Sequence, residues 1–326
     1  MSGSPDTRIT QQELPAWKPR FAPLSVVCIF LGVGAAFVPL GYACLRASRS
    51  VVEASRRYDD ICVPGDTVED REAFLYQQDG AGTICNVTLT APRRMAAPVF
   101  VYYELDNFYQ NHRRYLNSKS DAQLRGASAS VASLHTSCDP ETLLNGSSNA
   151  VIDPCGLVAW SYFNDTFVPI LDGAALSVDN SHIAWPSDIN YKFANAAPTN
   201  FNTDPPLRGG GTLNGTLKDE HFVVWMRAAA LRNFRKLWGR IDQDIPAGAN
   251  VTVQIQNRYN TYAFDGQKKV VLSTASWLGG ANPFIGLAFL VVGGGSVTFG
   301  LSFALLAMCS QYKIGDSSRL SWNKNK

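Results

Sequence analysis

Four cysteines in the polar middle of the chain could form covalent cross-links or bind a metal ion. They are Cys62, Cys85, Cys138 and Cys155. In an oxidising compartment, four cysteines can form two disulfides in three different pairings, and pairing between sequence neighbours would close loops worth about 3 kcal/mol each. A zinc site with four cysteine ligands is the alternative, but such sites usually contain a CxxC pair, which this sequence lacks. We therefore expect two disulfides and no metal site.

Five asparagines stand in the Asn-X-Ser/Thr sequences that accept N-linked glycans. They are Asn86, Asn145, Asn164, Asn214 and Asn250. One acceptor sequence is common by chance, but five within one segment favour a middle domain that faces a lumen or the cell exterior. Disulfides persist in the same compartments, so the cysteines agree with the acceptor sequences.

Catalytic chemistry has little support in the sequence. There is no GxxxxGK[ST] phosphate-binding loop, no GxSxG nucleophile turn and no HExxH zinc motif, and the four histidines are scattered. We therefore predict no catalytic residue, no cofactor, no ATP binding and no nucleic-acid partner. An enzyme of the cell exterior whose site is assembled from distant residues, such as a glycosidase or an esterase, stays an alternative.

The most unusual polar stretch is Pro98 to Leu124, PVFVYYELDNFYQNHRRYLNSKSDAQL. In it, the aromatic residues Phe108, Tyr109 and Tyr115 interleave with an Asn-His-Arg-Arg run at 111–114. Such a mixture could form a basic groove for phosphate groups, although a solvated helix face is the more common arrangement. The residue types alone do not decide between the two.

Two uncharged apolar runs flank the middle of the chain and must anchor it. They are Phe21–Leu45 and Pro283–Met308. At about 1.5 Å per residue, each run is longer than a hydrocarbon core of roughly 30 Å, so each predicts a membrane-spanning helix. Two spans place both termini on the cytosolic side, opposite the acceptor asparagines. The predicted segments are a cytosolic tail at 1–20, a first span at 21–45, an ectodomain at 46–281, a second span at 282–309 and a cytosolic tail at 310–326.

Signal sequences and buried core helices fit these apolar runs less well than membrane spans. A cleaved signal peptide has an apolar region of about 7 to 15 residues, which is shorter than the first run. A GPI signal ends in its apolar tail, whereas a polar tail follows the second run. Two buried helices of a soluble protein would rarely be so long and so free of charge. The positive-inside rule is only half satisfied, because Arg46 and Arg49 follow the first span, so the acceptor sequences decide the orientation.

Strand patterns dominate the predicted ectodomain. Alternation around Val87 and Leu89 predicts one strand, and the run Val99–Tyr103 predicts another. The segments 251–256 and 269–274 predict two neighbouring antiparallel strands.

Helix is predicted in fewer places. Residues 46–57 could prolong the first span, because they contain no glycine or proline, and Ala228–Leu237 predicts a helix stopped by Gly239. The expected fold is therefore an α+β membrane protein, with two transmembrane helices flanking a large, mainly antiparallel β ectodomain with short helices and long loops.

The run YYELDNFYQNHRRYLNSKSDAQL closely resembles the marker segment of the CDC50/Lem3 family, the accessory β-subunits of type IV P-type (P4-type) ATPases that flip phospholipids. Two positions depart from the family pattern, Glu13 and Pro186, and they put only local contacts in doubt. Further matching blocks span nearly the whole chain: QQELPAWKP at 11–19, PCGLVAWSYFNDTF at 154–167, IAWPSD at 183–188, VVWMRAAALRNFRKLWGRI at 223–241 and WLGGANPFIG at 277–286.

The resemblance implies a non-catalytic subunit that forms a heterodimer with the catalytic subunit of a P4-type ATPase. The ectodomain would cap the lumenal or extracellular loops of that partner. The subunit would support folding, exit from the endoplasmic reticulum and transport of membrane phospholipid to the cytosolic leaflet, in the endoplasmic reticulum, the Golgi or endosomal membranes, or the plasma membrane. The resemblance also implies the pairings Cys62–Cys85 and Cys138–Cys155.

Aromatic and small residues supply candidate contacts with such a partner. Exposed aromatic rings are common at interfaces, and small residues spaced four apart, as in Gly32 with Ala36 and Ser296 with Gly300, let helices approach closely. A free-standing glycosylated receptor or adhesion ectodomain is the alternative function. The candidate contact residues are Trp17, Tyr109, Asn111, His112, Arg113, Arg114, Trp185, Gly293, Gly294 and Gly295.

Overall fold

The chain divides into two compact units in a computed structural model that describes residues 23–77, 82–147, 150–203 and 209–309. One unit consists of residues 1–49 and 282–326, and the other of residues 50–281. The two tails predicted at 1–20 and 310–326, and Trp17 with them, lie outside the described residues.

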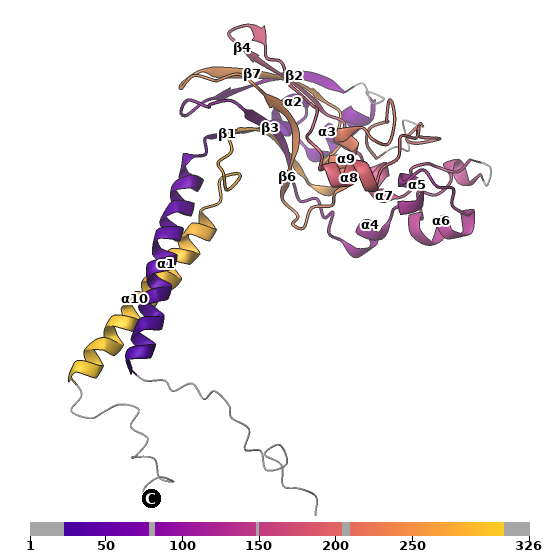
Figure 1. Cartoon of the computed structure of the whole chain (residues 1–326). Coiled ribbons are helices and arrows are strands. Elements are labelled where there is room, and N and C mark those ends of the chain that lie inside the picture. Colours follow the sequence, from indigo (N-terminus) through magenta and orange to yellow (C-terminus); the bar gives the residue numbers. More distant parts are fainter. Residues whose placement is uncertain (1–22, 78–81, 148–149, 204–208, 310–326) are drawn as a thin grey trace, which may run out of the picture. The chain divides into compact units, whose positions relative to one another are not determined.

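The first unit is a pair of long apolar helices that lie side by side (Figure 1). They are α1 (Pro23–Ser50) and α10 (Pro283–Cys309), and within the described residues they are the two helices long and apolar enough to cross a membrane. The helix of the first span continues past Leu45 to Ser50. It does not extend to Arg57 as predicted, because β1 (Glu53–Arg57) pairs there with a strand of the second unit.

The second unit contains two antiparallel sheets of four strands each. The first sheet has the order β1-β8-β3-β6, which places the first and last strands of the ectodomain next to each other, with Glu53 opposite Ser273. The strands β3 and β8 are central. The other bounds in this sheet are β8 (Gln267–Ser273), β3 (Val99–Asp106) and β6 (Phe234–Ile241).

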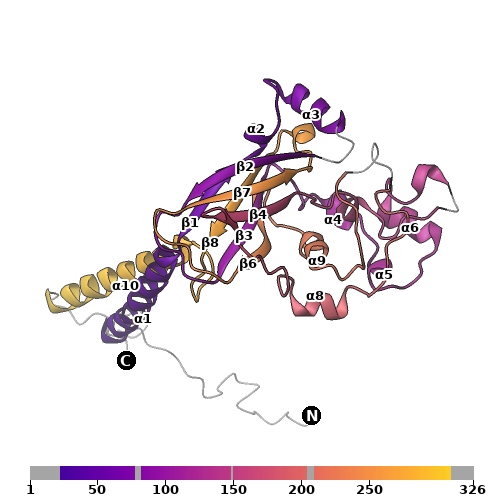
Figure 2. The same cartoon turned by 90° about the horizontal axis from the view of Figure 1, so that it is seen from above.

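The second sheet has the order β2-β7-β4-β5, and Figure 2 shows β2, β7 and β4 running side by side. A two-residue loop, Asp172-Gly173, joins its last two strands, and both loop residues have the positive φ that a tight hairpin requires. The bounds are β2 (Thr83–Thr90), β7 (Asn250–Asn257), β4 (Thr166–Leu171) and β5 (Ala174–Ala175).

The inner faces of both sheets contribute to one hydrophobic core. Along β3 every second residue from Val99 is buried, and along β7 the buried residues are Val251, Val253, Ile255 and Asn257. This alternation, which is visible in the sequence, faces one side of each sheet toward the core. The predicted strands at Val87–Leu89 and Val99–Tyr103 and the predicted α+β class are confirmed.

Two predictions about the ectodomain are wrong. Strands β7 and β8 are not neighbours, because the chain crosses from the second sheet to the first between them. Residues 228–237 are not helical: helix ends at Met226 and β6 starts at Phe234. Helix propensity was overridden there because Asn111 and Gln110, from a distant part of the chain, bind the backbone groups of Ala230 and Ala229. Lys236, inside the segment, binds the carbonyl of Val224.

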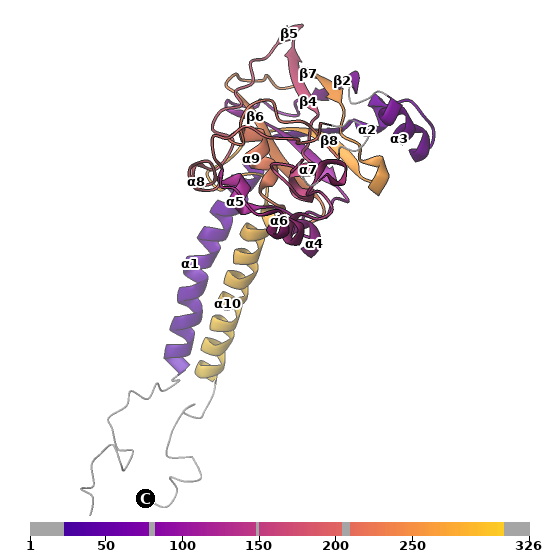
Figure 3. The same ribbon diagram turned by 90° about the vertical axis from the view of Figure 1, so that its right-hand side faces the viewer.

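Short helices fill the connections between the strands, and Figures 1 and 3 show α4, α5 and α6 gathered together. Their bounds are α2 (Asp59–Cys62), α3 (Val68–Gln77), α4 (Arg113–Asn117), α5 (Asp121–Leu124), α6 (Val131–Cys138), α7 (Leu157–Trp160), α8 (Pro186–Tyr191) and α9 (Glu220–Met226), with 3-10 turns η1 (Leu144–Gly146) and η3 (Tyr262–Phe264).

Candidate partner-binding surfaces

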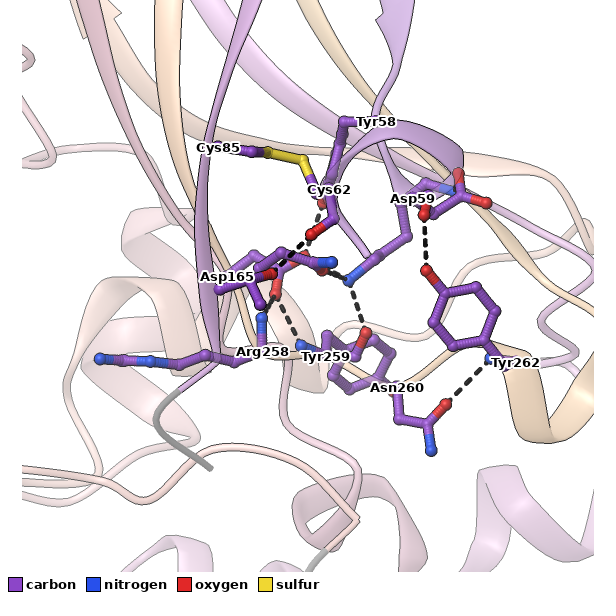
Figure 4. A network of polar contacts seen from close by, with 12 residues as sticks. Tyr58, Asp59, Cys62, Cys85, Asp165, Arg258, Tyr259, Asn260 and Tyr262 are labelled. Carbon is purple, nitrogen blue, oxygen red and sulfur yellow. Dashed lines mark hydrogen bonds and ion pairs between the residues drawn. A yellow bond between two sulfur atoms is a disulfide. The ribbon is translucent and has the colours of Figure 1, made fainter. Parts of the chain in front are cut away.

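An ion pair between Lys268 and Asp165 lies at the centre of the ectodomain core, with Nζ 2.7 Å from Oδ2 and both side chains fully buried. Asp165 also accepts hydrogen bonds from the Tyr58 hydroxyl at 2.7 Å and from the backbone N–H groups of Arg258 and Tyr259. Figure 4 shows Asp165 among these partners, with the Cys62–Cys85 disulfide nearby. The pair thereby ties the start of β4 to β8 and to the chain between β7 and β8.

Lys268 has two further acceptors, the side-chain oxygen of Asn257 and the carbonyl of Tyr259. Burial lowers the pKa of Lys268, and the charge of Asp165 opposes this effect. Burial also raises the pKa of Tyr58 well above its usual value. Both side chains of the ion pair are fully buried, and Asp165 is among the residues that line a hollow of about 340 Å³. The network positions the strands.

The segment from Asn107 to Asn117 divides into inward and outward residues. Phe108 packs edge-on against three rings of the core, and Gln110 is fully buried, with its Oε1 accepting from the Ala229 N–H at 2.9 Å. Tyr115 lies under the segment, where burial raises the pKa of its hydroxyl to about 12. These inward residues hold the outward ones in a fixed position.

The predicted contact residues of this segment all face solvent. Tyr109 is half exposed, and Asn111, His112, Arg113 and Arg114 are exposed. Asn111 donates to the carbonyl of Ala230 at 2.8 Å, so its position is fixed by the chain that precedes β6. The structure thus brings the five together on one exposed turn and the first residues of α4. Their contact with a partner stays a prediction.

Trp185, another predicted contact, stands at the start of α8 with 61% of its surface exposed. The guanidinium of Arg227 lies 4.5 Å from the centre of its ring. Glu220 fixes the backbone before it, because its carboxylate accepts from the N–H groups of His182 and Ala184, both at 2.9 Å. Pro186, which departs from the family pattern, occupies the first helical position, where its missing N–H is not needed.

A groove that sequence reasoning missed lies beside Trp185. It consists of two hollows of about 260 and 280 Å³ that share Asp188, Val223, Arg227 and Ala228 as lining residues. The Asp188 side chain is only 5% exposed and pairs with Lys192 at 2.6 Å and with Arg227 at 3.1 Å. The ion pair with Arg227 therefore lies between the two hollows.

Lys236 shapes the floor of this groove. Its ammonium donates to three backbone carbonyls at the end of α9, those of Val224, Trp225 and Arg227, at 2.6 to 3.0 Å. A cation at a helix C-terminus stabilises the last carbonyls, which have no partner within the helix. Burial lowers its pKa well below the usual value. This contact ends α9 and prevents the helix from continuing through residues 228–237.

The four ectodomain cysteines form two disulfides, Cys62–Cys85 and Cys138–Cys155. These are the pairings that the family resemblance implies. The three other cysteines, Cys28, Cys44 and Cys309, lie in α1 and α10 and are free.

The five acceptor asparagines all lie in the second unit, but their surroundings differ. Four are exposed, whereas Asn164 is half buried next to Asp165. The exposed ones are Asn86, Asn145, Asn214 and Asn250.

Within the helix pair, glycines spaced seven residues apart form the contact between α1 and α10. A Cβ on Gly286 would lie 2.6 Å from the backbone nitrogen of Leu45, and one on Gly41 would lie 2.8 Å from that of Leu290. Gly293 faces α1 in the same way, 2.9 Å from the nitrogen of Val38. We call this contact the glycine seam; it consists of Gly34 and Gly41 on α1 and Gly286, Gly293 and Gly300 on α10.

The predicted glycine patch is split by this arrangement. Gly293 belongs to the seam, but a Cβ on Gly294 or Gly295 would meet nothing within 4 Å in the described chain. The same holds for Gly32, so the predicted Gly32–Ala36 pair does not form the helix contact, whereas Ser296 and Gly300 are buried. The seam glycines of each helix are spaced seven residues apart, and this spacing was the sequence signal for the helix contact. The prediction used pairs spaced four residues apart and therefore missed most of the seam.

The chain is similar to one family of known proteins. The family model described as "LEM3 (ligand-effect modulator 3) family / CDC50 family" matches residues 44–313. The chain is 45% identical over 323 residues to ALA-interacting subunit 3 of Arabidopsis thaliana, covering 98% of this chain and 90% of that protein. It is 35% identical over 344 residues to Cell cycle control protein 50B of Homo sapiens, covering 95% of each.

Cell cycle control protein 50A of Bos taurus is similar over 333 residues at 32% identity, covering 94% of this chain and 89% of that protein. The match to the family model covers the exposed turn, the groove and the part of the glycine seam that lies in α10. Gly34 and Gly41 of α1 lie before residue 44, where this match begins. The chain therefore belongs to the CDC50/LEM3 family.

Proposed function

We propose that this chain is the non-catalytic accessory subunit of a P4-type ATPase that moves phospholipid from the exoplasmic to the cytosolic leaflet. The observation that carries the proposal is the family match over residues 44–313, together with relatives that are named as interacting subunits. The subunit would assist folding of its partner, exit from the endoplasmic reticulum and lipid translocation. It would act in the endoplasmic reticulum, the Golgi or endosomal membranes, or the plasma membrane.

In this proposal, α1 and α10 cross the membrane, residues 46–281 face the lumen or exterior, and both tails are cytosolic. The two disulfides and the five acceptor asparagines, all within residues 50–281, support this orientation. Glycosidase treatment of the protein from cells should lower its apparent mass. An unchanged mass would overturn the orientation.

We place one partner contact at the groove beside Trp185. This ring is large and exposed, and it is held by Arg227 and by the backbone contacts of Glu220, so little conformational freedom would be lost on binding. The exposed turn at 109–114 is a second contact. Gly294 and Gly295, which face away from the glycine seam, would form a third contact with the partner's membrane helices.

Co-purification tests the proposal. The tagged chain is expressed with each P4-type ATPase of the same organism, and we expect at least one to be recovered with it. Trp185→Ala should lower this recovery on the order of tenfold, as for an interface anchor worth about 1.4 kcal/mol or more. Tyr191→Ala is the matched control, because Tyr191 is an exposed aromatic of the same helix that lines neither hollow.

The outcomes separate the function from the surface. If the wild-type chain recovers no ATPase and reaches the cell surface when expressed alone, the proposed function fails and a free-standing receptor is favoured. If the ATPase is recovered equally well with Trp185→Ala, only the assignment of the groove fails.

A further inference from the structure

The groove beside Trp185 is bordered by an edge strand of the first sheet. β6 is the outer strand of that sheet, and α8 and α9 lie beside it (Figures 1 and 2). The hollow of about 280 Å³ is lined by Arg235, Lys236 and Leu237 of this strand and by the segment 183–185. The edge of β6 therefore borders a space that another segment could enter.

The pairing register determines which backbone groups of the first sheet point in which direction. In β8, the carbonyl of Lys268 accepts from the N–H of Tyr58, so even-numbered residues of β8 bond toward β1 and odd-numbered ones bond toward β3. Val271, an odd-numbered residue, lies opposite Tyr102 of β3. The even-numbered residues of β3 therefore bond toward β8, and the odd-numbered ones, such as Tyr103, bond toward β6.

Two residues of β6 direct their backbone groups away from the sheet. Lys236 lies opposite Tyr103, so its N–H and C=O point into the sheet, and those of Arg235 and Leu237 point outward. No hydrogen bond within the described residues uses these outward groups. Arg235 is exposed and Leu237 is half-buried, so this edge is open to solvent. Unpaired backbone groups along an edge strand are a template for a further strand.

The ectodomain itself pairs with the outer edge of β6 at Arg240. This residue exchanges two backbone hydrogen bonds with Asp179, at 2.7 and 2.9 Å. The chain then turns away from the strand, and His182 adopts a positive φ of 60° within this turn. One end of the edge is thereby covered, and the part that borders the hollow stays open.

The floor of the hollow has a positive charge that no carboxylate of the described residues neutralises by direct contact. Lys236 donates to three backbone carbonyls and forms no ion pair with a described carboxylate. Asp188, which supplies the acidic side chain of the lining, already pairs with Lys192 and Arg227. The rest of the lining includes apolar side chains such as Val223. An incoming segment that combines acidic and apolar side chains complements this lining.

We propose that an extended segment from the lumenal or extracellular loops of the partner ATPase adds a strand to β6 at Arg235 and Leu237, with an acidic and an apolar side chain at the hollow. This inference rests on the proposed function and specifies how the groove beside Trp185 binds the partner. In strand addition, backbone hydrogen bonds supply affinity, and the alternate side chains that enter a pocket supply specificity.

Amide hydrogen exchange tests the proposal at single residues. Exchange is followed by mass spectrometry with fragmentation that resolves individual amides, in the full chain alone and in its complex with the co-purified ATPase. We expect the Arg235 and Leu237 amides to exchange fast in the chain alone and to slow on the order of tenfold in the complex. The Lys236 amide is the internal control, because it bonds to Tyr103 within the sheet and should exchange slowly in both states.

The outcomes separate this inference from the proposed function. Slow exchange at Arg235 and Leu237 in the chain alone would show that the edge is already paired, and equal exchange in both states would show that no strand is added; either result overturns the inference alone. Slowing that depends on the concentration of the isolated chain would identify a second copy as the occupant and would also overturn it. Recovery of no ATPase would overturn the proposed function and this inference with it.

Proline variants supply a second test. Arg235→Pro removes the outward N–H without breaking a bond of the sheet, and Arg235→Ala keeps it, while both lose the ion pairs with Glu53 and Glu104. We expect recovery of the ATPase to be on the order of tenfold lower with Arg235→Pro than with Arg235→Ala. Leu237→Pro and Leu237→Ala form a second matched pair and should differ in the same direction. Equal recovery within both pairs would overturn the strand addition.

Discussion

The helix pair and the ectodomain core both pack closely, but with side chains of opposite size. Helices α1 and α10 meet at glycines, whose missing side chains let an atom of the opposite helix lie within 2.3 to 2.9 Å of the position that a Cβ would take. The two sheets instead enclose large side chains, among them the stacked rings of Tyr103 and Phe163 and the buried Lys268. In a lipid bilayer, close backbone contact replaces the hydrophobic effect that drives burial of large side chains in water.

This difference predicts how each region responds to substitution. The helix pair should be sensitive to added atoms, because its seam has no room for a Cβ. The ectodomain should be sensitive to removed atoms, because each large buried group is surrounded by partners that it would leave behind. Four measurements test this contrast, in order of decreasing expected effect.

Lys268→Met should destabilise the ectodomain most, by about 3–5 kcal/mol, because Asp165 would remain buried and charged without its partner. Thermal unfolding of the purified full chain measures the change. Lys269→Met is the matched control, since that adjacent side chain is partly exposed and pairs with Glu104 at 3.0 Å, a contact worth less than about 1 kcal/mol. Equal melting temperatures for the two variants would refute a dominant role for the buried pair.

Cys138→Ser should reduce the free energy of unfolding by about 3 kcal/mol, because it opens the cross-link between cysteines 17 residues apart. Cys155→Ser should have the same effect. Cys309→Ser serves as the control, because Cys309 is a free cysteine of α10. Denaturant unfolding of the two variants and the control measures the change, and wild-type stability in both ectodomain variants would show that this bridge contributes nothing.

Gly286→Leu should weaken the helix pair by about 1–3 kcal/mol, since its side chain would collide with the backbone of Leu45. Gly294→Leu in the same helix should leave the isolated chain unchanged, because it points into open space. The two variants are heated in detergent, and the fraction of protein that stays monodisperse is measured for each. If Gly294→Leu lowered recovery of the ATPase while the isolated chain kept its stability, that glycine would contact the partner; comparable damage from both variants in the isolated chain would contradict the seam.

The smallest expected effect is a pH dependence from His221. Burial lowers its pKa in the folded protein, despite the opposing charges of Asp219 and Glu220, so the folded state binds a proton less readily than the unfolded state. Its contribution to stability is therefore complete above pH 6.5 and declines as the pH falls below that value toward the folded-state pKa. Melting temperatures of wild type and His221→Phe between about pH 7.5 and about pH 5 measure it, and parallel curves would contradict it.

The individual strands could be predicted from the sequence because alternation marks which residues face the core. Sheet order could not, because it depends on pairs far apart in the chain, such as Ala54 with Leu272. The helix expected at 228–237 was wrong partly for the same reason, because the distant Gln110 accepts from the N–H of Ala229. Lys236, within the segment, also donates to the Trp225 carbonyl at the end of α9.

Some missed features did leave a signal. Lys268 is two residues before Val270 and four before Leu272 in β8, so alternation places all three side chains on the buried face of the strand. Lys269 falls on the opposite face. The seven-residue spacing of Gly286, Gly293 and Gly300 likewise marks one face of α10. A hollow of about 340 Å³ lined by Tyr103, Asn164 and Trp238 left no such signal, because it is assembled from segments far apart in the chain.

The position of β8 in the first sheet also has a consequence for biosynthesis. This strand is the last one of the ectodomain to be synthesised, yet it lies between β1 and β3, which are among the first. Until Gln267–Ser273 leaves the ribosome, two finished strands keep exposed backbone edges and Asp165 lacks its lysine. The order of strands therefore delays completion of the core until β8 has been synthesised. A chain cut short before β8 would keep unpaired strand edges exposed, and chaperones could bind them.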